Sequence, residues 1–257
     1  MEKSNGTIMT KNLNLLVLGG TSAIALSIVK KRLDDCVKYD RNLSVTLVGR
    51  DKGKLEVESQ HLQSIGVITT MEISDLSGFS DDVFKSGIQY DDVVIAYGSL
   101  TDQERAEGDR EYREYQIQTN FRSTVEWMEA SVQHFLSHGK GNMIVLGSVA
   151  GDRGRLSNYI YGTCKGAVEI YAQGLSHRFA NKKGINILLV KPGFVDTPMT
   201  ANIDKKGLLW AQPDKIAHDV ICAINKNKRM IYTPWFWRWI MLIIRNVPAF
   251  IFEKTKL

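Results

Sequence analysis

The chain has 257 residues, of which 44% are hydrophobic and 24% charged, and its net charge is +5. This length suits one large domain, and the composition excludes a disordered or fibrous chain. The mildly basic balance is compatible with an anionic cofactor, an anionic substrate or a membrane surface, and we expect no nucleic-acid partner because no such motif is present. The three cysteines, Cys36, Cys164 and Cys222, are far apart, which disfavours disulfides or a metal site and indicates a reducing cytoplasm.

Short apolar runs alternate along the chain with longer amphipathic segments. The predicted strands are 13–19, 44–49, 67–72, 92–97, 142–147, 185–190 and 230–233. The predicted helices between them are roughly 21–35, 52–64, 105–137, 157–181 and 213–226. Strands that alternate with helices predict βαβ units and a parallel sheet, and runs that are apolar throughout are typical of strands covered on both faces. We therefore expect an α/β fold, a doubly wound, Rossmann-type, three-layer sandwich with a seven-stranded parallel sheet.

The two ends of the chain depart from this alternation. Residues 1–12 are polar and lack the apolar core of a secretory signal, so we interpret them as an N-terminal extension. Residues 13–233 form one predicted domain, and 234–257 form an aromatic and basic tail. No window of about 18 consecutive residues is apolar throughout, which argues against a spanning helix.

The first predicted strand leads through a turn of small residues into a helix. Glycine or alanine at Gly19, Ala23 and Ala25 lets backbone N–H groups approach a pyrophosphate, and the helix dipole attracts the anion. The spacing alone is weak evidence, because a simple tight turn before a helix explains it equally well.

The end of the second predicted strand bears on which cofactor is used. A carboxylate there would bind ribose hydroxyls and repel a 2′-phosphate, but the chain has Gly49 followed by Arg50. A guanidinium pairs well with a phosphate, so we predict NADP(H) in preference to NAD(H). The alternative is that Arg50 is a solvated surface residue, and Asp51 could partly neutralise it.

The chemistry is indicated by Tyr161 and Lys165, which share one face of a predicted helix. The ordinary pKa of tyrosine is about 10, and we expect the ammonium to lower it. The phenol can then donate a proton to a carbonyl oxygen as hydride arrives. Ser148 follows an apolar strand at its carboxyl end, where ligands bind in such sheets.

With these motifs the chain resembles the short-chain dehydrogenase/reductase family from about residue 13 to residue 233. The family's catalytic tetrad corresponds to Asn120, Ser148, Tyr161 and Lys165. The resemblance implies that Ser148 orients the substrate oxygen and that Tyr161 transfers the proton. It also implies that Lys165 binds the nicotinamide ribose and that Asn120 supports a water-linked proton relay.

The resemblance further implies a set of cofactor-binding residues. They are Gly19, Thr21, Ser22, Ala23, Ile24, Arg50, Asp75, Leu76, Gly98, Tyr161, Lys165, Pro192, Gly193, Val195 and Thr197. Asp75 corresponds to the adenine-contacting aspartate, and Thr197 corresponds to the residue that holds the nicotinamide carboxamide. Ser22 stands where NADP-dependent members often have a basic residue, which leaves Arg50 as the main ligand of the 2′-phosphate.

Two further features bear on the substrate. Three of the five tryptophans lie in the tail with Arg238 and Arg245, which favours a helix lying in a lipid interface; the alternative is a helix packed in the core or in a dimer interface. Arg153 and Arg155, between Ser148 and Tyr161, are candidates to hold a substrate phosphate, and the alternative is a solvated charged loop.

The turn at 19–22, residues 98–104 and the tail are also similar to a subgroup, the decaprenylphosphoryl-2-keto-ribose reductases. That resemblance implies reduction of the keto-sugar of a polyprenyl-phosphate carrier for cell-wall or surface glycans, with a partner oxidase. The wider family implies a homodimer or homotetramer formed through 105–137 and 157–181. We expect a cytoplasmic protein, peripheral at the inner face of the membrane. The alternatives are a reductase of acyl thioesters or steroid-like ketones, and a non-catalytic NADP-sensing regulator, against which the complete tetrad argues.

Overall fold

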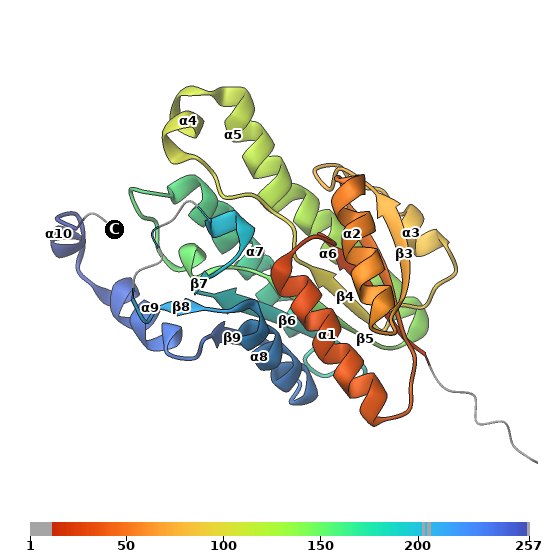
Figure 1. Ribbon diagram of the computed structural model, residues 1–257. Helices are drawn as coiled ribbons and strands as arrows, with labels where there is room; N and C mark the ends of the chain where they lie inside the picture. Colours follow the sequence, from red (N-terminus) through yellow and green to blue (C-terminus); the bar gives the residue numbers. More distant parts are fainter. Residues whose placement is uncertain (1–11, 202–203, 205–206, 256–257) are drawn as a thin grey trace, which may run out of the picture.

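The computed structural model describes residues 12–201, 204 and 207–255, so the predicted extension at 1–12 lies outside the described residues except for Asn12. Seven parallel strands form one sheet in the order β3-β2-β1-β4-β5-β6-β9, which confirms the predicted doubly wound fold (Figure 1). The strands are β1 (Leu13–Leu18), β2 (Leu43–Gly49), β3 (Ile68–Ile73), β4 (Asp92–Ile95), β5 (Gly141–Leu146), β6 (Ile185–Pro192) and β9 (Met230–Thr233).

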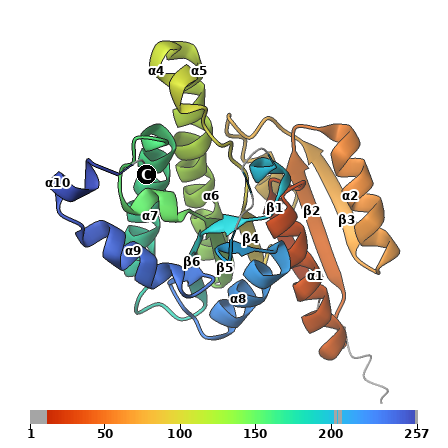
Figure 2. The same ribbon diagram turned by 60° about the vertical axis from the view of Figure 1, so that its left-hand side comes forward.

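Helices cover both faces of the sheet (Figures 1 and 2). One face carries α1 (Ala23–Lys38), α2 (Lys52–Ser64) and α8 (Pro213–Asn225), and the other carries α3 (Asp82–Lys85), α6 (Ser123–His138) and α7 (Tyr159–Arg178). In β1, Leu15 and Val17 face the first group while Leu16 and Leu18 face the second, and all four are fully buried. This two-sided burial explains the apolar runs that predicted the strands.

The prediction of one helix over 105–137 is wrong. The segment is divided into α4 (Gln103–Gly108), α5 (Arg110–Ile117), a π-helical turn η1 (Gln118–Arg122) and α6. The cause of the first break is Asp109, whose backbone is extended and whose carboxylate accepts a hydrogen bond of 2.9 Å from the Tyr112 amide, as an N-cap does. The helices α4 and α5 project from one end of the sheet (Figure 2).

Several predicted boundaries shift for local reasons. The helix predicted from residue 21 begins at Ala23, because Ser22 is its N-cap and its hydroxyl accepts from the Ala25 amide. The strand predicted over 92–97 ends at Ile95, and the strand predicted over 185–190 continues to Pro192. A small second sheet was not predicted, in which β7 (Phe194–Val195) pairs with β8 (Trp210–Ala211).

The tail folds into α9 (Trp237–Asn246) and the short α10 (Ala249–Phe252), which lies at the edge of the molecule (Figures 1 and 2). One face of α9 is packed, because Trp237 and Met241 are buried against Val149. Among the described residues, no helix combines the length and apolar character needed to span a bilayer. The predicted boundary between a domain at 13–233 and a tail at 234–257 stays a prediction.

Candidate active site

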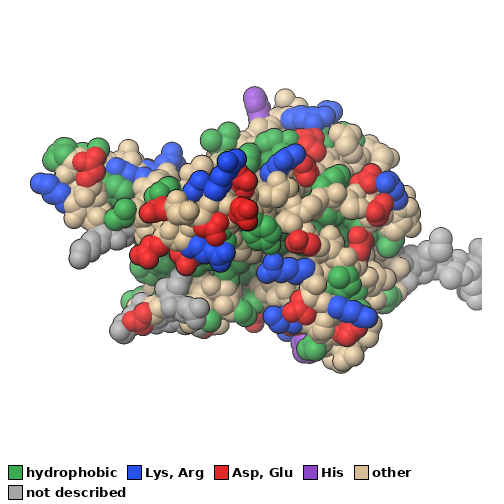
Figure 3. Space-filling model, turned by 90° about the horizontal axis from the view of Figure 1, so that it is seen from above, with side chains coloured by type: hydrophobic (Ala, Val, Ile, Leu, Met, Phe, Trp, Pro, Cys, Tyr) green, Lys and Arg blue, Asp and Glu red, His purple; other side chains and the backbone are tan. Residues whose placement is uncertain are grey.

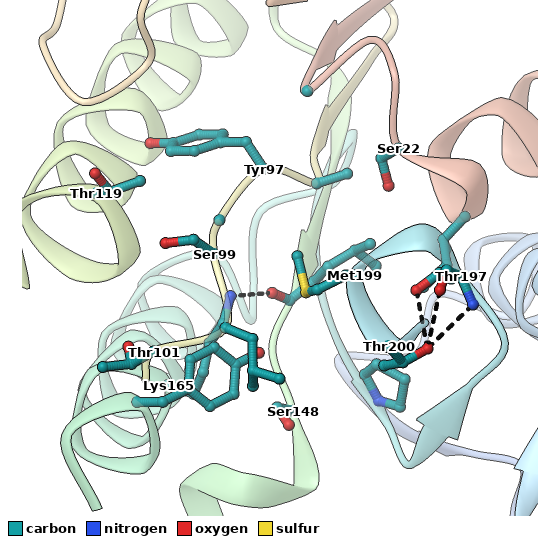
Figure 4. A pocket seen from close by; sticks show the side chains of 18 of the residues that line it. Ser22, Tyr97, Ser99, Thr101, Thr119, Ser148, Lys165, Thr197, Met199 and Thr200 are labelled. Carbon is teal, nitrogen blue, oxygen red and sulfur yellow. Dashed lines mark hydrogen bonds between the residues drawn. The ribbon is translucent and has the colours of Figure 1, made fainter. Parts of the chain in front are cut away.

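A cavity of about 690 Å³ opens where the carboxyl ends of the central strands meet. Its wall includes all of the residues predicted to bind the cofactor, together with Ser148 and Arg155. Figure 4 shows how segments distant in sequence face it: Ser148 and Lys165 lie on one side, and Ser22 and Thr197 on the other. Apart from Asn120 and Arg153, the residues predicted for cofactor, catalysis and substrate therefore line one cavity, while their individual roles stay predictions.

The turn after β1 approaches the cavity closely. Gly19 has φ +96°, and a Cβ atom there would lie 2.8 Å from the Tyr97 amide nitrogen, so only glycine fits. The first residues of α1, capped by Ser22, line the cavity directly. A helix N-terminus that opens on small residues suits a pyrophosphate, because its free N–H groups and its dipole favour an anion.

Arg50 lies at the cavity wall directly after β2. Its Nη1 donates a hydrogen bond of 3.1 Å to the phenol oxygen of Tyr115. Asp51 is engaged elsewhere: it accepts from the Lys54 amide and its carboxylate lies 3.3 Å from the Lys54 ammonium, interactions that lower the pKa of Asp51. Because Asp51 caps α2 and pairs with Lys54, its carboxylate is not used to neutralise Arg50. The positive charge of Arg50 therefore suits a phosphate in the cavity.

Asp75 and Leu76 follow β3 and line the same end of the cavity. The Asp75 carboxylate accepts hydrogen bonds from the amide and the hydroxyl of Ser77, at 3.4 Å and 2.9 Å. Leu76 is buried. A fixed carboxylate beside a buried apolar side chain suits one edge and one face of an adenine, and the adenine contact that the resemblance implies stays a prediction.

Tyr161 and Lys165 occupy successive turns of α7 and face the cavity. The Lys165 ammonium lies 5.8 Å from the centroid of the Tyr161 ring and donates a hydrogen bond of 3.0 Å to the Leu146 carbonyl at the end of β5. The Ser148 hydroxyl accepts from the Ala150 amide at 3.0 Å, which fixes it as the N-cap of a short helix, η2 (Val149–Asp152). Phenol, ammonium and hydroxyl therefore meet at the end of β5.

The expected lowering of the Tyr161 pKa by Lys165 is not found. Burial raises the pKa of Tyr161 to about 12, and the hydrogen bond with Ser148 opposes that rise only in part. Burial also lowers the pKa of Lys165 to about 8. Enclosure in a site of low polarity is thus the largest influence on both groups, because it disfavours their charged forms. Tyr161 is protonated at neutral pH, which suits a proton donor.

Asn120 is fully buried in the π-helical turn η1. Its Oδ1 accepts from the Ser99 amide at 3.0 Å, while its Nδ2 donates to the Ser99 carbonyl and to Gln116 Oε1, each at 3.1 Å. The amide side chain therefore fixes the segment after β4 against the helix. Local π-helical turns often mark functional sites. The relay role that the resemblance implies stays a prediction.

The two arginines between Ser148 and Tyr161 have different environments. Arg153 is outside the cavity: its Nη1 donates to the carbonyls of Ile244 at 2.5 Å and Val247 at 2.6 Å, and its guanidinium lies 3.8 Å from the Phe252 ring centroid. The prediction that Arg153 holds substrate is therefore wrong, because this side chain fastens the tail to η2. Only Arg155 of the pair lines the cavity.

Arg155 has unused hydrogen-bonding capacity at the cavity wall. Its Nε is buried and has no hydrogen-bond partner among the described residues, and the same holds for Asn158 Oδ1. Burial lowers the pKa of Arg155, with Asp152 acting in the opposite direction. A buried donor without a partner is costly unless a ligand pairs with it.

Other residues of the cavity wall were not predicted to bind the cofactor or the substrate. They include Tyr97, Ser99, Leu100, Thr101, Tyr115, Thr119, Ser157, Asn158, Phe194, Pro198, Met199 and Thr200. Phe194 directly follows the Pro-Gly turn, which was a usable signal, whereas Tyr115 reaches the cavity only because α5 projects over it. In the part of the chain described, no group of three or more His, Cys, Asp or Glu side chains is arranged to hold a metal ion.

Solved structures share this fold. A short-chain dehydrogenase from Sphingobium yanoikuyae in complex with NADPH has a TM-score of 0.76 at 19% identity, covering 92% of this chain and 97% of its own. A structure reported in a study of 7beta-hydroxysteroid dehydrogenase stereoselectivity has a TM-score of 0.79 at 16% identity. The match covers 92% of this chain and 93% of that structure's chain. An actinorhodin polyketide ketoreductase with NADPH has a TM-score of 0.72 at 20% identity, covering 86% of this chain and 95% of its own. At these identities the likeness is one of fold.

Sequence relatives agree over nearly the whole length. An uncharacterized oxidoreductase of Mycobacterium tuberculosis is 26% identical over 247 residues, covering 93% of this chain and 96% of the relative. An uncharacterized oxidoreductase of Streptomyces coelicolor is 28% identical over 247 residues, covering 94% and 95%. The family model described as short chain dehydrogenase matches residues 14–207. The chain therefore belongs to the short-chain dehydrogenase family and is an oxidoreductase acting on CH–OH and C=O groups.

Proposed function

We propose that this protein is an NADPH-dependent reductase whose ketone substrate carries an anionic group, most specifically the keto-sugar of a polyprenyl-phosphate-linked pentose in cell-wall or surface glycan synthesis. The observation that carries this proposal is Arg155, a half-buried side chain on the cavity wall whose buried Nε has no partner among the described residues. A substrate phosphate would pair with it. Asn158 and Ser157, on the same part of the wall, add polar groups suited to sugar hydroxyls.

The proposed chemistry assigns each polar residue of the cavity one task. Bound NADPH supplies the hydride. Tyr161 is protonated, because burial raises its pKa to about 12, and its phenol donates a proton to the carbonyl oxygen of the substrate. Ser148 holds that oxygen by a hydrogen bond, and the Lys165 ammonium stabilises the phenolate that remains.

The preference for NADPH rests on Arg50. Its guanidinium has several N–H donors, and among the described residues only Tyr115 accepts a hydrogen bond from it. Asp51 pairs with Lys54 and does not neutralise it. The Arg50 end of the cavity thus suits a 2′-phosphate, and a cofactor bound in this orientation would bring its nicotinamide toward Tyr161, where the hydride must be delivered. Two structures of similar fold contain NADPH.

The tail supports peripheral contact with a membrane. Trp235, Trp239, Ile243 and Phe250 are all more than half exposed, although Trp237 between them is buried. Figure 3 shows hydrophobic and basic side chains close together on the projecting end of the molecule, where acidic groups also occur. Exposed tryptophans beside arginines suit the headgroup region of a bilayer. Replacing Trp235, Trp239 and Ile243 together by serine should abolish sedimentation with anionic vesicles, and unchanged sedimentation would contradict the proposal.

We also propose a homodimer or homotetramer formed through α5, α6 and α7. Exposed apolar side chains on these helices, Ile117, Leu136 and Ile170, support it. Light scattering measures the mass of the protein in solution, and the mass of a monomer would contradict the proposed oligomer. A partner oxidase that forms the keto group fits the same scheme, because a reductase needs a source of its ketone.

A second candidate is reduction of another hydrophobic ketone, such as an acyl thioester or a steroid-like ketone. Phe194 and Met199 in the cavity wall favour it, because they offer an apolar surface. An NADP-sensing regulator without catalysis is a third reading, which the convergence of Ser148, Tyr161 and Lys165 on the cavity disfavours.

The test compares NADPH oxidation, followed by absorbance, on a polyprenyl-phosphoryl 2-keto-pentose and on a neutral hydrophobic ketone of similar size. Turnover of the lipid-linked sugar that depends on Arg155 supports the first candidate. Turnover of only the neutral ketone supports the second. NADPH binding without turnover of any ketone offered would favour the regulator.

A further inference from the structure

A buried ion cluster lies directly behind the proposed nicotinamide end of the cavity. Lys191 is the last residue before the Pro192–Gly193 turn, and its side chain is 1% exposed. Its ammonium pairs with two carboxylates, those of Asp152 and Glu169. The side chain of Asp152 is 0% exposed and that of Glu169 is 13% exposed, so solvent screens this cluster very little.

Tyr232 on β9 completes the cluster. Its phenol donates a hydrogen bond of 2.7 Å to Asp152 Oδ2, and the Lys191 ammonium lies 4.9 Å from its ring centroid. Burial by itself lowers the pKa of Lys191, but the two carboxylates raise it above its ordinary value. Lys191 is therefore charged, and without it two carboxylates would be buried with no counter-ion.

The three charged residues belong to three segments around the proposed nicotinamide end, and two of these segments adjoin or carry the catalytic Ser148, Tyr161 and Lys165. Asp152 ends η2, four residues after Ser148. Glu169 lies one turn after Lys165 on α7. The backbones of η2 and α7 also touch, because a Cβ atom at Gly166 would lie 3.0 Å from the Gly151 carbonyl oxygen. The remaining segment, the end of β6 with its Pro-Gly turn, joins this unit through Lys191.

We propose that Lys191 is a positioning residue, which holds the Pro192–Gly193 turn in register with the Ser148 loop and the Tyr161 helix and so shapes the nicotinamide half of the cofactor cavity. Arg50 lies at the other end of that cavity and has no part in the cluster. Loss of the Lys191 charge should therefore disturb one half of the cofactor site and leave the other half intact. This inference rests on the proposed placement of the 2′-phosphate at Arg50.

The test needs no ketone, because it measures binding of two probes to the whole protein. NADPH occupies both halves of the site, whereas 2′-phospho-ADP-ribose lacks the nicotinamide. In Lys191→Met, displacement of the turn should raise the Kd for NADPH about tenfold or more. The Kd for 2′-phospho-ADP-ribose should stay within about twofold of the wild-type value. Lys191→Arg, which keeps the charge, should restore most of the NADPH affinity.

A matched control separates positioning from general destabilisation. Arg32 pairs with the buried Asp92 at 2.6 Å, and Arg32 does not line the cavity. Arg32→Met should lower the melting temperature, as Lys191→Met does, without changing either Kd. If Lys191→Met does not fold, Glu169→Gln keeps the Lys191–Asp152 pair and should show the same selective loss, by a smaller factor.

The outcomes are distinct. Equal weakening of both probes, or unchanged binding of both, in a folded Lys191→Met protein would overturn the inference. So would a lack of rescue by Lys191→Arg. If the wild-type protein binds NADH and not NADPH, the assignment of Arg50 fails instead, and the same comparison is made with NADH and ADP-ribose.

Discussion

The guanidinium of Arg50 donates a hydrogen bond of 3.1 Å to the phenol oxygen of Tyr115, which joins the end of β2 to α5 across the cavity. The two residues are 65 positions apart in the chain. The contact holds Arg50 at the cavity wall, where its free N–H groups can meet a phosphate.

Arg50→Glu should raise the Kd for NADPH by about tenfold to a hundredfold, which is the worth of a charge-assisted hydrogen bond to a phosphate. The Kd for NADH should change little. Both constants can be measured by nicotinamide fluorescence. Lys52→Glu is the matched control, because Lys52 is exposed two residues later and is not in the cavity wall. Equal losses for the two cofactors would show that Arg50 does not read the 2′-phosphate.

The pH dependence of kcat/KM for ketone reduction should have an alkaline limb near pH 8. Burial lowers the pKa of Lys165 to about 8 in the free protein, so the ammonium is present below that pH and is lost as pH rises through it. Without the ammonium, the phenolate left on Tyr161 is less stabilised, and kcat/KM falls. Tyr161 itself, with its pKa raised to about 12, adds no limb in this range.

The variant Lys165→Arg identifies the group behind that limb. An arginine stays charged throughout this pH range, so the variant should be slower and have a flat profile between about pH 7 and 10. If the limb persists in the variant, it belongs to another group.

Arg153→Ala should destabilise the protein through its tail. The substitution removes hydrogen bonds from a charged group to the Ile244 and Val247 carbonyls and the contact with the Phe252 ring, at a cost of about 2 kcal/mol. For a chain of this size the melting temperature should fall by about 4–8 °C, as measured by calorimetry. Arg238→Ala, on the exposed side of α9, should leave the melting temperature nearly unchanged. Equal stability of the two variants would show that Arg153 does not fasten the tail.

Arg155→Ala should raise KM about tenfold or more for a ketone that carries a phosphate, because the lost guanidinium is the phosphate's proposed partner. The KM for a neutral ketone should be unchanged, which steady-state kinetics can check. An equal rise for both substrates would show that Arg155 shapes the cavity without reading charge.

The sheet and the cavity were largely predictable, because their signals are local. Runs such as 13–18 are apolar at every position, since both faces of the strand are covered. Tyr161 and Lys165 at helical spacing, with Ser148 at a strand end, all line the cavity. The roles of these residues remain predictions until they are substituted.

The features that the sequence did not reveal depend on contacts between distant segments. The predicted 105–137 helix breaks where the Asp109 side chain caps α5. Arg153 is adjacent to the catalytic motif in sequence but binds the tail, 91 residues away. The buried pairing of Lys191 with Asp152 and Glu169 had one signal in the sequence, a lysine at the end of an apolar run. Nothing in the sequence indicated which carboxylates would pair with it. The pKa of Tyr161 is raised because the side chain is buried. The spacing of residues along a helix does not reveal how deeply a side chain is buried.

The most direct test of the central claim, proton donation by Tyr161 during ketone reduction, compares NADPH oxidation by the wild type and Tyr161→Phe on the phosphate-bearing keto-sugar. The account predicts that kcat falls by a factor of about 10² to 10⁴, because the proton donor is lost while the ring and its packing remain. The Kd for NADPH should stay within about twofold, since the lost hydroxyl is at most one contact among many. A Tyr161→Phe protein that oxidises NADPH as fast as the wild type would contradict the account.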